Sequence, residues 1–474
     1  MAERPVLWTA SEAEAATGGI TNKAWSATGV SIDTRSLTIG DLYLAIEGER
    51  LDGHDFVDAA FDAHAAAAMV AAGKSDRWTG FPLLKVGDTF EALNALGAAA
   101  RIRSHARIAA ITGSVGKTST KEALSFVLAR QGNTAASLGN LNNHWGVPLS
   151  LARMPADAAY GVFELGMNSP GEIAPLSRLV RPHVAIITTI APAHTEFFSS
   201  LGEVADAKAE IFAGLSGGIA ILNRDNPFFP QLAVAARTAG VGRTVGFGAH
   251  KEATARLIDV KLDGEGSDVR ALLDGQDVRY RLGQPGRHLV FNSLAVLAAA
   301  NALGADMKQA AADIAEVPAA KGRGERIKGP VAGGEIVIID DSYNASPAAM
   351  RAAIETLSQI TPEAGGRRLL ALGDMLELGA KSGELHAGLA ETITANGIEL
   401  VFTAGPQMEH LHNALPRDVR GVHAADSERL AKLLVDLVQA GDVITVKGSL
   451  GSRMARVVDA LREPRRASNT AANG

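Results

Sequence analysis

The chain has 474 residues, of which 47% are hydrophobic and 21% are charged, and this length suggests about three globular domains. Its 46 basic and 52 acidic residues give a net charge of −6, which does not favour nucleic acid as a partner. Cysteine is absent, so disulfides, thiolate metal sites and cysteine nucleophiles are excluded. The first residues lack the apolar core of a signal peptide, and no apolar run is long enough to span a bilayer. We therefore expect a cytoplasmic protein that binds neither nucleic acid nor a membrane.

The predicted elements fall into three consecutive groups. Residues 1–86 contain short strand-like segments and Ala-rich helical segments, which predict a smaller α/β domain. Within 87–319, strands that are apolar throughout alternate with helices from Ile108 onward, a pattern typical of a parallel sheet covered on both faces. A second series of strand, loop and helix over 320–462 predicts a Rossmann-like domain. We expect residues 463–474 to form a disordered tail.

The most informative motif is a glycine turn between a predicted strand and a predicted helix, in RIAAITGSVGKTSTKEALSFVLA. Backbone N–H groups in such a turn, with the positive end of the helix dipole behind them, bind phosphate. Lys117 can add a cation for the β- and γ-phosphates, and the Thr118 hydroxyl can ligate Mg²⁺. The loop is a shortened form, G-x-x-G-K-T, because the first glycine of the full pattern would fall at Ile111 inside the strand. The order of strand, turn and helix favours a P-loop ATPase-like central domain over a glycine turn with a surface lysine.

Side chains near the ends of further predicted strands are candidates for holding the metal of a bound nucleotide. Glu164 ends the strand in YGVFELG, where it would lie beside the phosphate loop, although an acid that caps a strand exit is an equal alternative. His194 follows the strand in VAIITTI, but a lone histidine is more often structural. Lys208 falls on a predicted helix and, from its local sequence alone, reads as a solvated lysine.

Six motifs occur in a fixed order along the chain: TGSVGKTSTKE, GNLNNHWGVP, FELGMNSPGEI, DDSYNASPAAM, GDMLELG and VKGSLGSRM. Together they resemble the Mur ligase family over nearly the whole chain, and GNLNN and DDSYNASP resemble the members that act last in the cytoplasm. The resemblance implies an ATP-dependent amide ligase that adds D-alanyl-D-alanine to UDP-N-acetylmuramoyl tripeptide and so completes the peptidoglycan pentapeptide precursor. The tripeptide carboxylate would take the γ-phosphate of ATP, and the dipeptide amine would then displace phosphate.

Several alternatives stay open at this point. A sister ligase that adds the third amino acid, or a folate-glutamating enzyme of the same superfamily, would share much of the pattern. A P-loop nucleotide switch is a different class, and the absence of an N-K-x-D guanine motif after the phosphate loop argues against it. The sequence does not distinguish a tripeptide that ends in lysine from one that ends in diaminopimelate. Nothing in it requires more than a monomer.

The resemblance also assigns roles around ATP, which the central domain and the third domain would hold between them. The metal ligands of two Mg²⁺ ions would include Thr118, Glu164, His194 and Lys208, where Lys208 matches a lysine that is often carbamylated. Asn292 would contact adenine, although Leu289 replaces an asparagine that usually follows the histidine here at 288. Residues with predicted catalytic roles are Lys117, His194, Lys208 and Arg323. Predicted nucleotide contacts are Gly113, Ser114, Val115, Gly116, Lys117, Thr118, Ser119, Asn292, Arg323, Asp341, Tyr343 and Asn344.

For the other substrates the resemblance points to separate segments. Two polar turns of the first domain would bind the uridine nucleotide, and two ordinary polar turns are an almost equally good interpretation. Asparagines of GNLNN would face the muramoyl peptide, and the end of VITVKGS would meet the peptide or the incoming dipeptide. The residues predicted in this way are Ser31, Arg35, Ser36, Asp52, Gly53, His54, Asn142, Asn143, Lys447 and Ser449.

Overall fold

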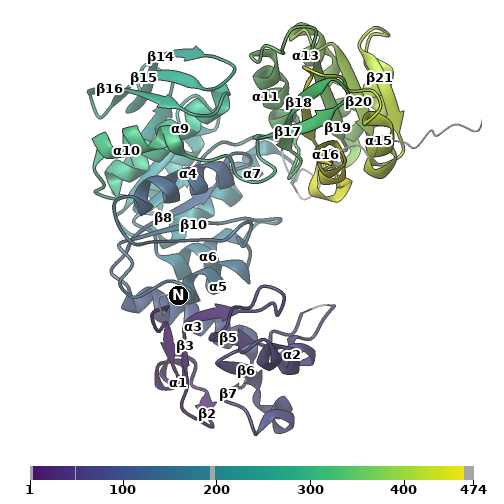
Figure 1. Cartoon of the computed structure of the whole chain (residues 1–474). Coiled ribbons are helices and arrows are strands. Elements are labelled where there is room, and N and C mark those ends of the chain that lie inside the picture. Colours follow the sequence, from purple (N-terminus) through teal and green to yellow (C-terminus); the bar gives the residue numbers. More distant parts are fainter. Residues whose placement is uncertain (1–3, 49, 193–197, 464–474) are drawn as a thin grey trace, which may run out of the picture.

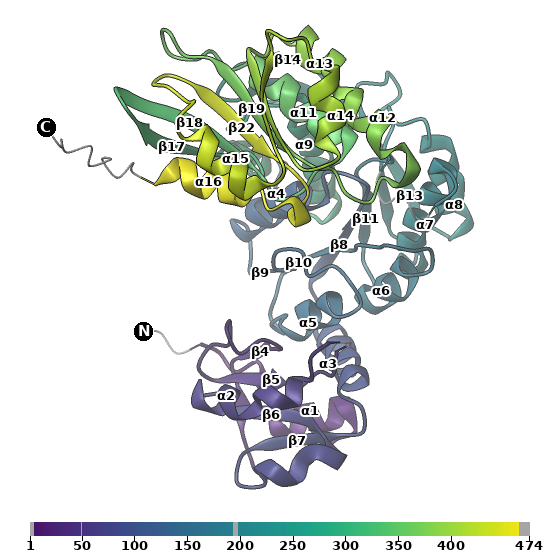
Figure 2. The same ribbon diagram turned by 90° about the vertical axis from the view of Figure 1, so that its right-hand side faces the viewer.

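The computed structural model describes residues 4–48, 50–192 and 198–463, and these residues form three α/β units, each built on its own main sheet (Figures 1 and 2). In both views the N-terminal unit lies at one end of the molecule, and the C-terminal unit lies beside the central one. The predicted α/β fold class is confirmed. Predicted site residue His194 and the predicted tail beyond residue 463 lie outside the described residues.

The N-terminal unit has a five-stranded sheet in the order β2-β7-β6-β5-β4, in which only β2 is antiparallel to its neighbour. A separate ribbon pairs β1 with β3. Its elements are β1 (Trp8–Thr9), α1 (Ala10–Thr17), β2 (Ile20–Thr21), β3 (Ser26–Ala27), β4 (Gly29–Ser31), β5 (Asp41–Leu44), η1 (Gly53–Phe56), α2 (Val57–Asp62), β6 (Ala67–Ala71), η2 (Ala72–Trp78) and β7 (Leu83–Val86).

Helix α3 (Thr89–Arg103) joins this unit to the next one. Asp88 caps its N-terminus by accepting hydrogen bonds from the backbone N–H groups of Phe90 and Glu91, as N-cap aspartates do. Its buried face, which includes Leu93, packs in the same apolar cluster as the first sheet and also reaches Leu149 of α5 (Gly146–Ala152). The last strand of the first sheet ends at Val86, and α3 packs against both the N-terminal and the central unit.

The central unit contains a nine-stranded sheet in the order β16-β15-β14-β13-β12-β11-β8-β10-β9. Across the sheet, each neighbouring pair from β9 at one edge through β8 to β14 is parallel. Strands β14, β15 and β16 then pair antiparallel up to the other edge. Its strands are β8 (Arg107–Thr112), β9 (Thr134–Ala136), β10 (Tyr160–Glu164), β11 (Val184–Ile187), β12 (Ile219–Asn223), β13 (Arg243–Gly248), β14 (Ala255–Leu262), β15 (Ser267–Leu273) and β16 (Gln276–Leu282). Besides α5, its helices are α4 (Lys117–Ala129), α6 (Ile173–Val180), α7 (Leu201–Ala209), η4 (Glu210–Gly214), α8 (Phe229–Thr238), α9 (Arg287–Ala302), α10 (Met307–Asp313) and η5 (Ile314–Glu316).

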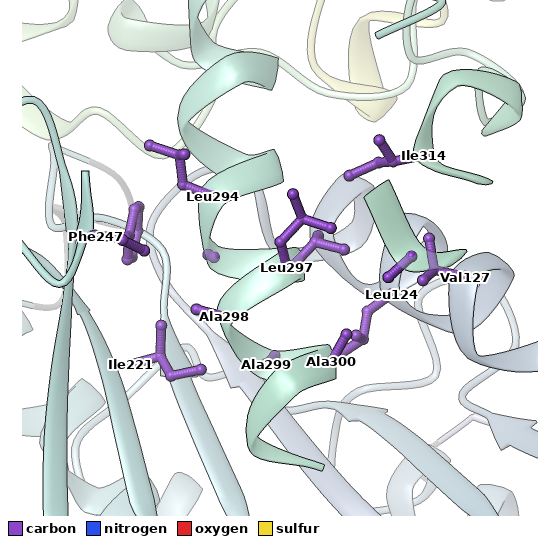
Figure 3. Packing of buried hydrophobic residues seen from close by; sticks show 14 of the residues in the cluster. Leu124, Val127, Ile221, Phe247, Leu294, Leu297, Ala298, Ala299, Ala300 and Ile314 are labelled. Carbon is purple, nitrogen blue, oxygen red and sulfur yellow. The ribbon is translucent and has the colours of Figure 1, made fainter. Parts of the chain in front are cut away.

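Apolar clusters cover both faces of this sheet, as the uniformly apolar strands predict. On one face α9 lies between the sheet side chains Ile221 and Phe247 and the side chains Leu124 and Val127 of α4 (Figure 3). Helices α5 to α8 contribute to the cluster on the other face. This packing fixes α4, and with it the phosphate loop at its start, on the sheet.

The C-terminal unit has a six-stranded sheet in the order β17-β18-β22-β19-β20-β21, parallel except for β17. Helices α11, α13 and α14 pack on one face, and α15 and α16 pack on the other. Its elements are β17 (Glu325–Val331), β18 (Gly334–Asp341), α11 (Pro347–Ser358), β19 (Arg368–Gly373), η6 (Gly379–Lys381), α12 (Ser382–Ala387), α13 (Leu389–Ala395), β20 (Leu400–Ala404), α14 (Met408–Ala414), β21 (Arg420–Ala424), α15 (Ser427–Leu434), β22 (Val443–Lys447), η7 (Leu450–Ser452) and α16 (Ala455–Arg462).

The segment between η5 and β17 leads from the central unit to the C-terminal one. Within the described ranges, the structure contains no helix that is both long enough and apolar enough to cross a membrane.

Candidate active site

A cavity of about 680 Å³ lies where the central and C-terminal units face each other. The central unit contributes the phosphate loop, the asparagine loop around Asn142 and the end of β10. The C-terminal unit contributes residues that follow β18, β19 and β22. Both sheets therefore present the carboxyl ends of parallel strands to one space, where ligands of open α/β sheets bind.

The phosphate loop connects β8 to α4 and lies at the edge of this cavity. Gly113 and Gly116 have φ values of 146° and 86°, which strain any residue with a side chain. The loop is held by the segment after β11, because Ser114 N donates to Thr189 O at 2.8 Å and Thr188 Oγ1 donates to Val115 O at 2.5 Å. Residues 114–119 all line the cavity, as the motif predicts for a loop that surrounds phosphates.

Lys117 is the cation of this loop, and its Nζ donates to Gly113 O at 2.7 Å. Burial lowers the pKa of Lys117, and the positive charge of Arg323 adds to that shift while the Glu164 carboxylate opposes it. An anionic phosphate in the cavity would favour the charged form of this amine.

Glu164 ends β10 with 1% of its surface exposed, beside the phosphate loop as its strand position predicts. Its Oε2 accepts a hydrogen bond from Thr118 Oγ1 at 2.8 Å, and its Oε1 accepts one from Asn142 Nδ2 at 2.8 Å. A hydroxyl and a carboxylate are oxygen ligands of the kind that Mg²⁺ takes. Thr118 and Glu164 therefore fit one such ion at the phosphate loop.

Lys208, on α7, is buried with 3% of its surface exposed, so its interpretation as a solvated lysine is wrong. Burial and the nearby charge of Lys117 lower the pKa of Lys208 well below its ordinary value. Such a shift favours the neutral, nucleophilic form of the amine over the charged one. Among the residues that the structure describes, no group of three or more His, Asp and Glu side chains could hold a metal. The predicted ligand His194 lies outside the described residues.

The predicted residues of the C-terminal unit meet the phosphate loop across the cavity. The guanidinium of Arg323 lies 4.4 Å from the ring centroid of Tyr343, in cation–π contact. Lys447 Nζ donates to Asp341 Oδ2 at 2.7 Å and to Asn344 O at 2.9 Å. Asp341 and Lys447 are register partners at the ends of β18 and β22, which explains why these side chains meet.

Two further predicted substrate residues of the cavity have structural partners in the free protein. Asn143 Oδ1 accepts hydrogen bonds from Trp145 N at 3.2 Å and Gly146 N at 2.9 Å, at the start of α5. Ser449 Oγ accepts one from Leu376 N at 3.0 Å. Lys447, with 3% exposure, is likewise engaged within the protein. Their contact with a peptide stays a prediction.

Asn292 lies on the first turns of α9 against the phosphate loop. Its Nδ2 donates to Ser119 Oγ at 3.3 Å, and a Cβ on Gly116 would lie 3.1 Å from that amide. His288 and Leu289 line the cavity one turn earlier. The surrounding protein lowers the pKa of His288 by desolvation, although its ring is exposed to the cavity. The α9 N-terminus thus borders the phosphate loop, and the contact of Asn292 with adenine stays a prediction.

The predicted uridine residues lie in the N-terminal unit, away from this cavity. Ser31 Oγ donates to Asp33 O at 3.0 Å, and Ser36 Oγ donates to the same oxygen at 3.3 Å. Arg35 is exposed and forms an ion pair with Asp33 at 2.7 Å. This segment is an ordered polar turn in which Arg35 and Ser36 are exposed.

The second polar turn of this unit is held by His54. Its Nε2 accepts a hydrogen bond from Ala71 N at 2.9 Å, so Nδ1 carries the proton that is donated to Asp52 Oδ1 at 2.6 Å. Lys74 Nζ lies 2.6 Å from Asp52 Oδ2. Burial would raise the pKa of Asp52, but the hydrogen bonds from Lys74 and His54 outweigh it and lower the pKa. A Cβ on Gly53 would lie 2.6 Å from Ile46 N, so this glycine is required by close packing.

Residues that the sequence analysis did not single out also line the cavity, among them Asn140, Glu172, Arg326 and Leu376. Asn140 and Leu376 belong to the motifs GNLNN and GDMLELG, whose presence was a signal for them. Arg326 follows KGRGE, and its guanidinium donates to Gly264 O of the central unit. No local pattern marks a contact between two units.

Comparison with known proteins places the chain in a family. Family models match it in order: a Mur ligase family catalytic domain over 26–77, a Mur ligase middle domain over 111–300 and a Mur ligase glutamate ligase domain over 322–450. The UDP-N-acetylmuramoyl-tripeptide–D-alanyl-D-alanine ligase of Escherichia coli (strain K12) is 39% identical over 437 residues, which cover 92% of this chain and 93% of that protein. The chain belongs to the Mur ligase family.

Further Mur ligases agree along the whole chain. The ligase of the same description from Rickettsia prowazekii is 33% identical over 96% of this chain and 99% of its own length. A crystal structure of MurF from Acinetobacter baumannii matches with a TM-score of 0.83 at 29% identity, covering 96% of this chain and 99% of that one. MurF ligase from Thermotoga maritima in complex with ADP matches with a TM-score of 0.73 at 27% identity, over 92% and 97% of the two chains. As a Mur ligase, the chain is an ATP-dependent amide ligase.

Proposed function

We propose that this Mur ligase joins D-alanyl-D-alanine to UDP-N-acetylmuramoyl tripeptide at the expense of ATP. The observation that carries the proposal is the meeting of the phosphate loop with Arg323 and Asp341 of the C-terminal unit in one cavity. Relatives that are similar over more than nine-tenths of the chain carry the corresponding name and support the choice of substrates.

The chain's own residues account for the first half of the reaction. The loop from Gly113 to Ser119 holds the phosphates of ATP, and Lys117 and Arg323 oppose the negative charge that builds up on the transferred group. A tripeptide carboxylate oxygen forms the new bond to the γ-phosphorus while the bond from that phosphorus to ADP breaks. The product is an acyl phosphate, whose phosphate is a good leaving group.

In the second half, the amine of the dipeptide attacks the acyl carbon and the carbon–oxygen bond to phosphate breaks. The amine loses one proton, and inorganic phosphate leaves with the oxygen that came from the carboxylate. Asn142 and Asn143 lie on the central wall of the cavity, where they would face the peptide end of the first substrate. An acyl phosphate must be kept from bulk water during this step, because water would hydrolyse it.

Two Mg²⁺ ions complete the proposed site. Thr118 and Glu164 would hold one, and Mg²⁺ there would neutralise charge between the phosphates and the incoming carboxylate. Lys208 and His194 would hold the second, with Lys208 carrying a carbamate formed when its neutral amine adds to CO₂ and loses a proton. The burial and the lowered pKa of Lys208 support that chemistry.

The carbamate proposal has a direct test in Lys208→Ala. We expect ligation to fall to background and short carboxylic acids to restore part of it, because they replace the carbamate oxygens. Infrared or ¹³C NMR detection of a carbamate in protein equilibrated with ¹³CO₂ gives a readout that does not depend on activity. Full turnover by Lys208→Ala would refute the proposal.

The N-terminal unit would bind the UDP end of the first substrate, with Arg35 as the exposed cation for its phosphates. We further propose that the ligase acts as a cytoplasmic monomer, since its proposed substrates are a uridine nucleotide precursor, a free dipeptide and ATP.

The experiment that tests the function measures phosphate release from Mg-ATP with two substrate pairs. One pair is UDP-N-acetylmuramoyl tripeptide with D-alanyl-D-alanine, and the other is the dipeptide precursor with lysine or diaminopimelate. We expect release with the first pair alone, and a pentapeptide product by mass spectrometry. Release with the second pair would assign the chain to the sister reaction, and release without any amine would point to a nucleotide switch.

A further inference from the structure

Lys121 is a buried cation that neither the predicted site nor the proposed reaction uses. It lies on α4, the helix that starts at the phosphate loop, and its side chain has no exposed surface. Burying an ammonium group is costly unless its donors find partners. All three of its donors do: Ser137 O at 2.8 Å, Gly139 O at 3.1 Å and the Glu122 carboxylate at 2.6 Å.

The two carbonyl groups belong to the asparagine loop, which we define as residues 137–143. This loop leaves β9, and its ends are tied to β10 and the segment after it by hydrogen bonds from Ser137 N to Val162 O at 3.0 Å and from Gly166 N to Asn142 O at 2.8 Å. In its middle, Leu138 is 60% exposed and Asn140 is also exposed. Gly139 has a φ of 52°, so the chain turns sharply there. Lys121 thus fastens the start of the loop to α4 through two backbone carbonyl groups.

The far end of the loop carries a residue of the candidate site. Asn142 Nδ2 donates to Glu164 Oε1, and the other carboxylate oxygen of Glu164 accepts from Thr118 Oγ1, each at 2.8 Å. Thr118 and Lys121 are three residues apart on α4 and therefore lie on one helix face. The contacts close a ring: α4 holds Glu164 through Thr118, and it holds the asparagine loop, and so Asn142, through Lys121.

We propose that Lys121 is a positioning residue of this ligase, which keeps the Asn142 amide on Glu164 and so fixes the orientation of the carboxylate beside the phosphate loop. Free rotation of that carboxylate would separate its oxygens from Thr118. Partners that orient the residues of a metal-binding site typically affect affinity or activity by about 10- to 100-fold. The inference rests on the proposed function for its activity readout.

The test is a double-mutant cycle between Lys121→Met and Asn142→Ala, measured as kcat/KM for UDP-N-acetylmuramoyl tripeptide. If Lys121 acts through Asn142, each single variant loses about 10- to 100-fold and the double variant loses little more than Asn142→Ala alone. Glu122→Gln is the matched control, because it removes the ion pair but leaves both carbonyl contacts, and we expect it to stay near the wild type. Additive losses in the cycle, or full activity of Lys121→Met, would overturn the proposal.

Calorimetric binding of ADP with and without Mg²⁺ supplies a readout apart from turnover. We expect the gain in ADP affinity on adding Mg²⁺ to shrink by roughly tenfold in Lys121→Met while ADP alone binds as in the wild type. A purely structural role would lower the melting temperature and leave that gain intact. Should Lys121→Met not fold, Lys121→Gln, which keeps a donor for Ser137 O, enters the same cycle. A wild type without ligation would refute the proposed function, whereas an active wild type with an additive cycle refutes only this inference.

Discussion

The cavity between the central and C-terminal units and the polar turns of the N-terminal unit use the same kinds of residue for different purposes. In the cavity, glycines, a lysine, a glutamate and asparagines from separate elements converge on one space. In the N-terminal unit, the serines and the histidine bind backbone groups of that unit, Asp52 pairs with His54 and Lys74, and the exposed Arg35 pairs with Asp33. The difference teaches that convergence of side chains from distant segments, more than residue type, distinguishes a site from a turn.

The largest effect should come from Lys117→Ala, which tests the cavity side of this comparison. Removing a charge that stabilises the transferred phosphoryl group should lower kcat by about 10²- to 10³-fold. The melting temperature should change little, because the hydrogen bond that Lys117 Nζ makes is to a backbone carbonyl of its own loop, Gly113 O. Steady-state phosphate release measures the effect, with the surface variant Lys432→Ala as control. A normal kcat in Lys117→Ala would show that the lysine of the phosphate loop takes no part in the reaction.

Gly53→Ala tests the opposite side, since we assign this predicted uridine residue to packing. Its new Cβ would lie 2.6 Å from Ile46 N and 2.7 Å from Ile46 O, both backbone atoms that cannot turn away. We expect a loss of about 1–3 kcal/mol in the free energy of unfolding of the N-terminal unit. Urea unfolding followed by fluorescence measures it, and Gly73→Ala, whose Cβ would meet nothing within 4 Å, is the matched control. Unchanged stability together with a raised KM for UDP-N-acetylmuramoyl tripeptide would show that Gly53 belongs to the substrate site.

Arg35→Ala asks whether the exposed residue of the first turn binds substrate. A charge-assisted hydrogen bond contributes about 1.5 kcal/mol, so KM for UDP-N-acetylmuramoyl tripeptide should rise about tenfold. ADP affinity should not change, because Arg35 lies in another unit than the phosphate loop. Arg77→Ala, an exposed arginine of the same unit, serves as control. An unaltered KM would leave this turn without a role in binding.

The smallest effect that we expect is a change of stability with pH, caused by the buried His386 near the edge of the cavity. His386 is fully buried, its Nε2 accepts from Met375 N at 2.9 Å, and its Nδ1 faces Ser382 O at 2.7 Å. Burial lowers the pKa of His386, and the hydrogen bond to Ser382 only partly opposes that shift. The neutral ring therefore stabilises the fold above an ordinary pKa near 6.5, and this stabilisation is lost as the pH falls below it.

Thermal melting between pH 7.5 and 5.5 measures this effect. We expect the wild type to lose its stability advantage over His386→Gln progressively below about pH 6.5. The change should stay under about 1.4 kcal/mol per pH unit, because one proton is involved. A constant difference across this range would show that the charge of His386 does not matter.

Local sequence patterns predicted much of this architecture, because a strand that is buried on both faces of a sheet is apolar throughout. The apolar strand before Gly113 and the glycines around Lys117 were enough to predict the phosphate loop. The position of Glu164 at the end of its strand was enough to predict that it lies beside this loop. The same pattern predicted that the sheet is parallel, and β8 pairs in parallel with both β10 and β11.

Other features could not be read in that way. Lys208 looks like a surface residue of an ordinary helix, and its burial depends on how α7 packs against segments far away in sequence. Asp341 and Lys447 meet only because β18 and β22, about a hundred residues apart, are neighbours in the sheet. Ser31 and His54 were predicted as ligand contacts, whereas Ser31 Oγ donates to Asp33 O within its own turn and His54 Nε2 accepts from Ala71 N at the end of β6.

The most direct test of the central claim follows an oxygen atom. The account holds that the cavity activates the tripeptide carboxylate as an acyl phosphate, so phosphate leaves with one carboxylate oxygen. With the tripeptide carboxylate labelled with ¹⁸O, mass spectrometry of the released phosphate should find one labelled oxygen per amide bond formed. Ligation that releases unlabelled phosphate would contradict the account, because the carboxylate would then not have attacked the γ-phosphate.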